Sequence, residues 1–197
     1  DQFRDEQRRL GEEWGWHTPI NSPFVPTRQG TGNAMILPFP AIPGTMSSRN
    51  IISTALCPHI LQDMEKAIDG EELYARSQTL SFGMPRGGIE IFEHDIYTIV
   101  LAPYGAPIAE ALAVVPAEKR PPLNKSFFDG YMPLYENWTF GLCCFNNKDA
   151  ALAKPLLWWY EPMRSDLLFL PALDCHTGNV PDLKALVQVD HTVAVSS

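Results

Sequence analysis

The spacing of hydrophobic residues changes from a helical period to a strand-like period after residue 70. Between residues 58 and 69 the apolar side chains recur every three or four positions and share one helical face. They are Ile60, Leu61, Met64, Ala67 and Ile68. Pro58 suits the first turn of a helix, and Gly70 follows as a stop signal. The pattern therefore predicts a helix over residues 58–69.

From residue 73 onward the apolar residues alternate with polar ones or form short runs between turn residues, as in β-strands. The predicted strands are 89–92, 96–101, 138–145, 156–160, 167–170 and 186–195, the last as one strand or two. Residues 93–95 form either the turn of a hairpin or part of one long strand. A short helix is predicted at 107–115 and a polar loop at 116–125. Polar turns between consecutive strands favour antiparallel pairing, because parallel neighbours need crossovers of about a dozen residues or more.

The N-terminal part of the chain has a different composition. Residues 1–16 form a further predicted helix, with Phe3, Leu10 and Trp14 on one stripe. Residues 17–46 then carry six prolines and three glycines. Proline fixes φ and lacks an N–H donor, so neither a helix nor a central strand fits this segment. We expect it to run as an extended arm over the surface.

Together these elements predict an α+β fold, a mainly antiparallel β-sheet with about three helices and a long Pro-rich N-terminal arm. We expect a single domain over residues 1–197. Within it, the helix at 1–16 and the arm at 17–46 are loosely attached, and residues 47–197 form the main body. We further expect the strands between residues 89 and 195 to form one sheet, backed by the helix at 58–69.

Composition supports an independent core and narrows the range of partners. Hydrophobic residues make up 45% of the chain, which is enough apolar surface to fold without a metal or disulfides. The net charge is −8 and no dense run of Lys and Arg occurs, so we expect no nucleic-acid partner and no membrane association. No stretch approaches the roughly 18 apolar residues of a membrane span.

Cysteine usage and the N-terminus bear on location. Four cysteines are too few for a disulfide scaffold, and we expect Cys143 and Cys144 to be buried reduced thiols on opposite faces of a strand. We expect a cytoplasmic protein, because the sequence shows no signal-peptide pattern. The chain begins at Asp1 rather than Met, which leaves open a trimmed start and a removed signal.

One candidate site groups acids and imidazoles in the last third of the chain. Asp174, His176 and His191 are the candidate catalytic residues, because carboxylates and imidazoles serve as general acids and bases. Together with His94 they are also the candidate ligands of a divalent metal, either iron or zinc. However, about 40% of histidines would have an acid within two positions by chance at this acid content. The spacing also matches no dense metal signature, so a structural Asp–His hydrogen bond is the simpler role and a metal is not favoured.

The second candidate site is the aromatic triplet Trp158, Trp159 and Tyr160. On a strand, Trp159 would face one side and its two neighbours the other. This arrangement gives either burial on both sides or one exposed aromatic platform for a ligand or a partner. We therefore expect a binding or protein-interaction domain without catalytic activity, with a protein partner or self-association. The alternative is a small metal-assisted or acid/base hydrolase or lyase that uses the His/Asp cluster.

Overall fold

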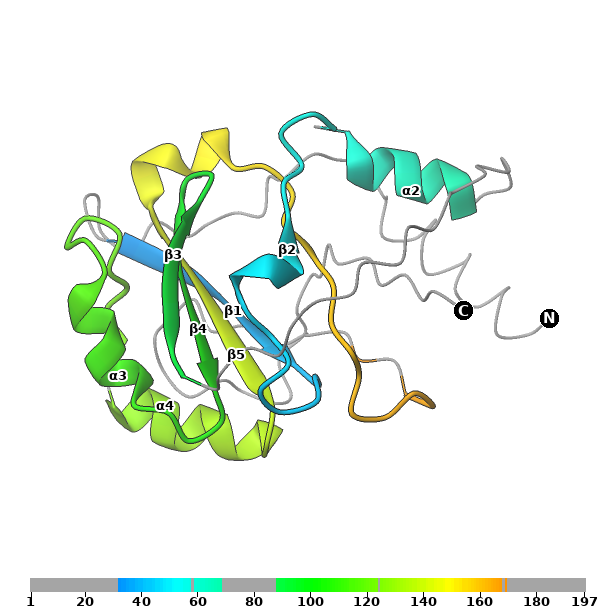
Figure 1. The fold of residues 1–197 in the computed structure, drawn as a ribbon. Helices are drawn as coiled ribbons and strands as arrows, with labels where there is room; N and C mark the ends of the chain where they lie inside the picture. Colours follow the sequence, from blue (N-terminus) through cyan, green and yellow to red (C-terminus); the bar gives the residue numbers. More distant parts are fainter. Residues whose placement is uncertain (1–31, 58, 69–87, 124, 168, 170–197) are drawn as a thin grey trace, which may run out of the picture.

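The computed structural model describes residues 32–57, 59–68, 88–123, 125–167 and 169 (Figure 1). The strands are β1 (Gly32–Phe39), β2 (Ile51–Ile52), β3 (Glu90–His94), β4 (Tyr97–Pro103), β5 (Thr139–Asn146) and β6 (Leu157–Trp158). The α-helices are α2 (Ile60–Ile68), α3 (Ile108–Ala111) and α4 (Lys125–Tyr131). Within these ranges four short 3-10 helices accompany them, η1 (Ser48–Asn50), η2 (Leu112–Val114), η3 (Met132–Tyr135) and η4 (Asn147–Leu152).

Four strands form one antiparallel sheet in the order β1-β5-β4-β3. The central strand β5 pairs with β1 on one side and with β4 on the other, so that Leu142 lies between Ile36 and Val100. Nearly every residue of β5 is buried, which explains its apolar sequence on both faces. The sheet therefore has two covered faces.

Helices cover the first face. The buried side chains on this side form what we call the helix-side cluster. Its members are Val100, Ala102, Ile108, Leu112, Val115, Phe127, Phe128, Tyr131, Tyr135, Phe140, Leu142 and Cys144. Figure 1 shows α3 and α4 along this side of the strands. The rings of Phe127 and Tyr131, one helical turn apart on α4, stack with their centroids 5.4 Å apart.

A two-stranded ribbon covers the second face. We define the ribbon as residues 40–54 and 154–163, which run antiparallel and pair as β2 and β6. Buried side chains on this face form two small clusters, which we call the ribbon-side clusters. The first contains Phe39 and Leu101 of the sheet with Ala41 and Met46 of the ribbon, and the second contains Tyr97, Ile99, Cys143 and Phe145 of the sheet. One sheet thus lies between a helical layer and a thin ribbon.

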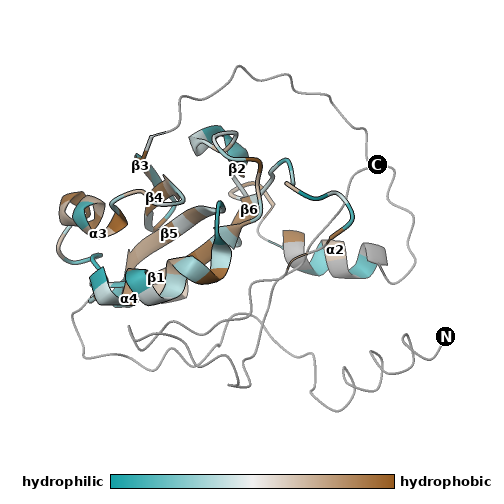
Figure 2. Ribbon diagram, turned by 90° about the horizontal axis from the view of Figure 1, so that it is seen from below, coloured by the Kyte–Doolittle hydropathy of each residue, from teal (hydrophilic) through white to brown (hydrophobic). Residues whose placement is uncertain are grey.

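The predicted α+β class with an antiparallel sheet is confirmed, but two expectations about the arrangement are wrong. β6 pairs with β2 in the ribbon and does not belong to the main sheet. The helix predicted over 58–69 is present as α2, yet it does not back the sheet, since neither Ile60 nor Met64 belongs to the clusters described above. Figures 1 and 2 both show α2 to one side of the sheet. The sheet is backed by α3 and α4 instead.

The expected surface arm over 17–46 is wrong for residues 32–46, the part of it that the structure describes. Gly32–Phe39 form β1 of the main sheet, and Phe39, Ala41 and Met46 are buried. Pro38 is tolerated because β1 is an edge strand, where a missing donor can face away from the sheet. The helix predicted at 1–16 and the rest of the arm, 17–31, lie outside the described residues.

The remaining predictions hold to different degrees. Residues 93–95 are part of a hairpin, in which Asp95 adopts a positive φ of 52° between β3 and β4. The helix at 107–115 is α3 continued by η2, and the strand at 138–145 is β5. The strand expected at 156–160 is shorter, and α4 was not predicted. Of 167–170 only Leu167 and Phe169 are described, outside any strand, and 186–195 is outside the described ranges.

Candidate functional site

The aromatic triplet lies in the ribbon, and its side chains alternate between the two sides. The ring of Trp158 packs on Phe39 with 5.1 Å between the centroids, and the ring of Tyr160 contacts the same Phe39 at 5.8 Å. Trp159 faces the other way and keeps 38% of its surface exposed. Two aromatic residues therefore cover the sheet, and the third faces solvent.

Hydrogen bonds hold Trp159 in place from the opposite segment of the ribbon. Its backbone N–H donates to the carbonyl of Asn50 at 3.0 Å, and its own carbonyl accepts from Asn50 Nδ2 at 3.0 Å. The indole Nε1 donates to the Arg49 carbonyl at 3.3 Å. The backbone and the indole nitrogen of Trp159 are thus both held by hydrogen bonds, which limits the rotation of the exposed ring.

The local sequence explains why Asn50 is positioned for this role. Ser47 caps η1, and Asn50 closes a capping box by accepting from the Ser47 backbone N–H at 2.8 Å. Asn50 is only 3% exposed, and its side-chain amide bonds both the Ser47 backbone N–H and the Trp159 carbonyl. A short capped turn therefore orients the side chain that holds Trp159.

On the side of the ribbon that faces the sheet, hydrogen bonding of the buried polar groups is less complete. Burial raises the pKa of the Tyr160 phenol above its usual value. Among the described atoms, Trp158 Nε1 is buried without a hydrogen-bond partner. An unpaired buried donor destabilises the packed state, typically by about 1–3 kcal/mol. The contact between ribbon and sheet is therefore mainly apolar.

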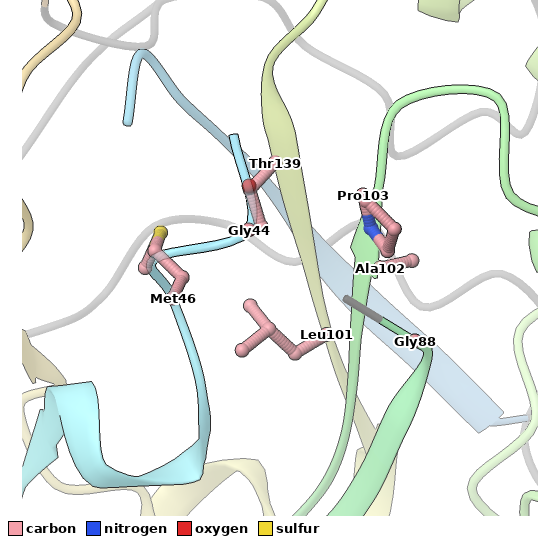
Figure 3. A pocket seen from close by; sticks show the side chains of 7 residues that line it. All are labelled: Gly44, Met46, Gly88, Leu101, Ala102, Pro103 and Thr139. Atoms are coloured by element: carbon pink, nitrogen blue, oxygen red, sulfur yellow. The ribbon is translucent and has the colours of Figure 1, made fainter. Parts of the chain in front are cut away.

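A small hollow lies beside this contact (Figure 3). It is lined by Gly44 and Met46 of the ribbon and by Gly88, Leu101, Ala102, Pro103 and Thr139 of the sheet region. Its free volume of about 10 Å³ corresponds to one water molecule. Organic ligands occupy pockets of roughly 300 Å³ or more, and none of these seven residues is titratable. This hollow between described residues is therefore too small to hold an organic ligand.

His94 is the one predicted metal ligand within the described ranges. It ends β3 and is half-buried, and this burial lowers its pKa, although the neighbouring Asp95 carboxylate acts in the opposite direction. Asp95 itself accepts from the Lys154 backbone N–H at 3.2 Å and pairs with Lys154 Nζ at 3.5 Å. The turn thus connects the hairpin to the ribbon.

The other members of the acid–imidazole cluster, Asp174, His176 and His191, lie outside the described residues. Their convergence with His94 stays a prediction. Within the part of the chain that the structure describes, no group of three or more His, Cys, Asp and Glu side chains is placed to hold a metal ion.

Phe39, Arg49 and Asn50 also belong to the aromatic site, and no sequence pattern predicted them there. Asn50 is separated from Trp159 by 109 positions, so no local pattern reports their contact. A weak signal was present nevertheless, because Ser47 followed three residues later by a polar side chain is the pattern of a capped turn.

Fold and site together define the class of the protein as an α+β domain with an antiparallel sheet between helices and an aromatic ribbon. None of the described helices is both long and apolar enough to cross a membrane. Comparison of the chain with models of known protein families, with curated proteins and with solved structures finds no match.

Proposed function

We propose that this protein is a protein-interaction domain without catalytic activity, and that the outer side of the ribbon around Trp159 is its contact surface. The observation that carries the proposal is the division of the aromatic triplet. Trp158 and Tyr160 pack on Phe39, whereas Trp159 is fixed by hydrogen bonds and stays exposed. Tryptophan is enriched among the residues that dominate binding energy, and a fixed ring loses little freedom on binding.

The surroundings of Trp159 fit the composition of an interface. Ile42 is 36% exposed, and its backbone N–H donates to the Glu161 carbonyl at 2.9 Å on the neighbouring segment. Strand alternation places Glu161 on the same outer side as Trp159. Arg49 is also exposed. Exposed apolar residues on the two paired segments of the ribbon, together with the charged residues Arg49 and Glu161, fit the usual composition of a protein–protein interface.

Photo-crosslinking tests the proposal. A benzophenone amino acid is placed at position 159 of the full chain in the cells that make it, and the adduct is identified by mass spectrometry. The matched control carries the same group at Val114, which is 70% exposed and lies on the helix side. We expect a protein adduct from position 159 and none from position 114.

The affinity of the identified partner then gives the decisive measurement. Trp159→Ala should weaken binding by about tenfold or more, as loss of a central tryptophan does, and Val114→Ala should leave it unchanged. The proposal is wrong if position 159 gives no adduct, or if the partner binds the Trp159→Ala variant as tightly as the original chain.

The alternative proposal, a hydrolase or lyase built on Asp174, His176, His191 and His94, has less support. In the described ranges its one member is His94, which sits at a hairpin tip beside a carboxylate that pairs with Lys154. Elemental analysis of the purified protein separates the metal-dependent form of this alternative from the binding proposal, because stoichiometric zinc or iron would favour the enzyme.

A further inference from the structure

The two covers of the sheet differ greatly in how much apolar side chain they bury. Among the described residues, the segment 108–135 contributes seven buried hydrophobic side chains to the helix-side cluster. These are Ile108, Leu112, Val115, Phe127, Phe128, Tyr131 and Tyr135. The ribbon contributes two, Ala41 and Met46, and its Trp158 and Tyr160 are half-buried. Because attachment strengthens with the apolar area removed from water, the ribbon is the more weakly held cover.

The ribbon is nevertheless well bonded within itself. Its two segments are joined by Ile42 N–H to the Glu161 carbonyl at 2.9 Å, by Met163 N–H to the Pro40 carbonyl at 2.8 Å, and by Thr54 Oγ1 to the Pro155 carbonyl at 2.8 Å. These bonds extend along most of its length. The ribbon can therefore move as one unit without losing its own structure.

The hydrogen bonds and the ion pair that join the ribbon to the β3–β4 hairpin lie near the surface. The Ser48 backbone N–H donates to Glu90 Oε2 at 2.7 Å in an exposed position, and the Lys154 side chain, which pairs with Asp95, is 44% exposed. Exposed pairs of this kind contribute little to stability. The link from β5 to the ribbon, η4, contains no buried residue. Among the described residues, attachment thus depends mainly on the apolar contacts in the two ribbon-side clusters.

We infer that the ribbon opens as a unit while the helix side of the sheet stays packed, and that this opening uncovers the apolar side chains that the sheet itself contributes to the ribbon-side clusters. Local opening of this kind occurs where few apolar contacts hold a segment whose internal bonds are intact. The inference concerns the sheet beneath the ribbon and does not depend on the partner proposed for Trp159.

Two adjacent cysteines report on the two faces separately. Cys143 belongs to a ribbon-side cluster and Cys144 to the helix-side cluster, because neighbouring residues of β5 point to opposite faces. Both thiols are buried, and burial raises the pKa of both, that of Cys144 to about 12. A buried neutral thiol does not react with an alkylating reagent. Each cysteine is therefore labelled only when its own face opens.

The experiment alkylates the wild-type chain with a limiting amount of iodoacetamide under native conditions. Tandem mass spectrometry locates the label on Cys143 or on Cys144, and exposed Cys57 serves as the fast internal control. We expect Cys143 to be labelled at least about tenfold faster than Cys144. Equal rates would mean that both faces open only in one cooperative step, and faster labelling of Cys144 would mean that the helix side opens first. Either result would overturn the inference.

A pair of variants provides a second test. Trp158→Ala removes an apolar contact of the ribbon, and Leu112→Ala removes one on the helix side. We expect the first to accelerate labelling of Cys143 alone and the second to accelerate labelling of Cys144 alone. If each variant accelerates both sites equally, the two covers are not independent and the inference is wrong. Circular dichroism confirms that each variant is folded, and the wild-type measurement holds without them.

Discussion

Among the glycines that the structure describes, the tightest constraint occurs at Gly32, the first residue of β1. A Cβ atom at this position would lie 2.1 Å from the carbonyl carbon of Lys119 and 2.3 Å from the backbone nitrogen of Arg120. Both are backbone atoms, which cannot move aside by a change of rotamer. The loop before α4 therefore crosses the start of β1 at a distance that only glycine permits.

We predict that Gly32→Ala lowers the free energy of unfolding by about 3 kcal/mol, because the added methyl group forces two packed backbone segments apart. Urea denaturation measures the change. Gly88→Ala is the control, since a Cβ there meets no atom within 4 Å, and its effect should stay within about 0.5 kcal/mol. Equal stability of the Gly32→Ala variant and the wild type would show that the loop does not approach β1 so closely.

At the scale of elements, the ribbon depends on Asn50, which joins its two segments. Asn50→Ala removes the bond to the Trp159 carbonyl and leaves the buried backbone N–H of Ser47 without its acceptor. We predict a loss of about 2 kcal/mol in the free energy of unfolding, measured by urea denaturation. The control is Ser53→Ala, which removes an exposed hydroxyl that accepts from the Ala55 backbone N–H. It should change the free energy of unfolding by less than about 0.5 kcal/mol. Similar effects of the two substitutions would contradict the role given to Asn50.

The elements that could be predicted from the sequence are those with a local period. The hairpin of β3 and β4, the buried strand β5 and the helix at α2 all show their period within ten residues or so, so neighbouring positions suffice. β1 was missed because the six prolines of residues 17–46 indicated an extended surface arm, whereas Pro38 is compatible with an edge strand such as β1. α4 was missed because it is short and contains Gly130. It is stabilised by tertiary packing of Phe127, Phe128 and Tyr131.

The candidate site was predictable in part for the same reason. The alternation of Trp158, Trp159 and Tyr160 follows from the strand period, but the period alone does not say which side is exposed. That depends on Phe39, which is more than a hundred positions away and meets the triplet only in the folded chain. Contacts at such separation leave no periodic signal in the sequence.

At the scale of the whole molecule, the net charge of −8 works against the compact state. The ion pairs between described residues are partly or fully exposed, as at Lys125–Asp129 and Arg164–Asp166, and such pairs contribute little. Self-repulsion should therefore outweigh the loss of these pairs when salt is added. We predict that an increase from about 20 mM to about 500 mM NaCl raises Tm by a few degrees, measured by differential scanning calorimetry.

The control for this prediction is Glu118→Lys at an exposed position, which changes the net charge from −8 to −6 because one acid is replaced by one base. The salt dependence of Tm should be smaller in this variant. A Tm that falls with added salt in the wild type would show that attraction between opposite charges dominates.

Pro38 has a consequence for how the protein behaves at high concentration. It lies in β1, at one border of the sheet as far as the structure describes it, and its side chain is fully buried, so this position offers a docking strand neither an amide hydrogen nor an open surface. Lateral growth of the sheet into a fibril is therefore disfavoured from this border. Among the strands that the structure describes, the other border of the main sheet is the short strand β3, and we expect lateral pairing to be easier there.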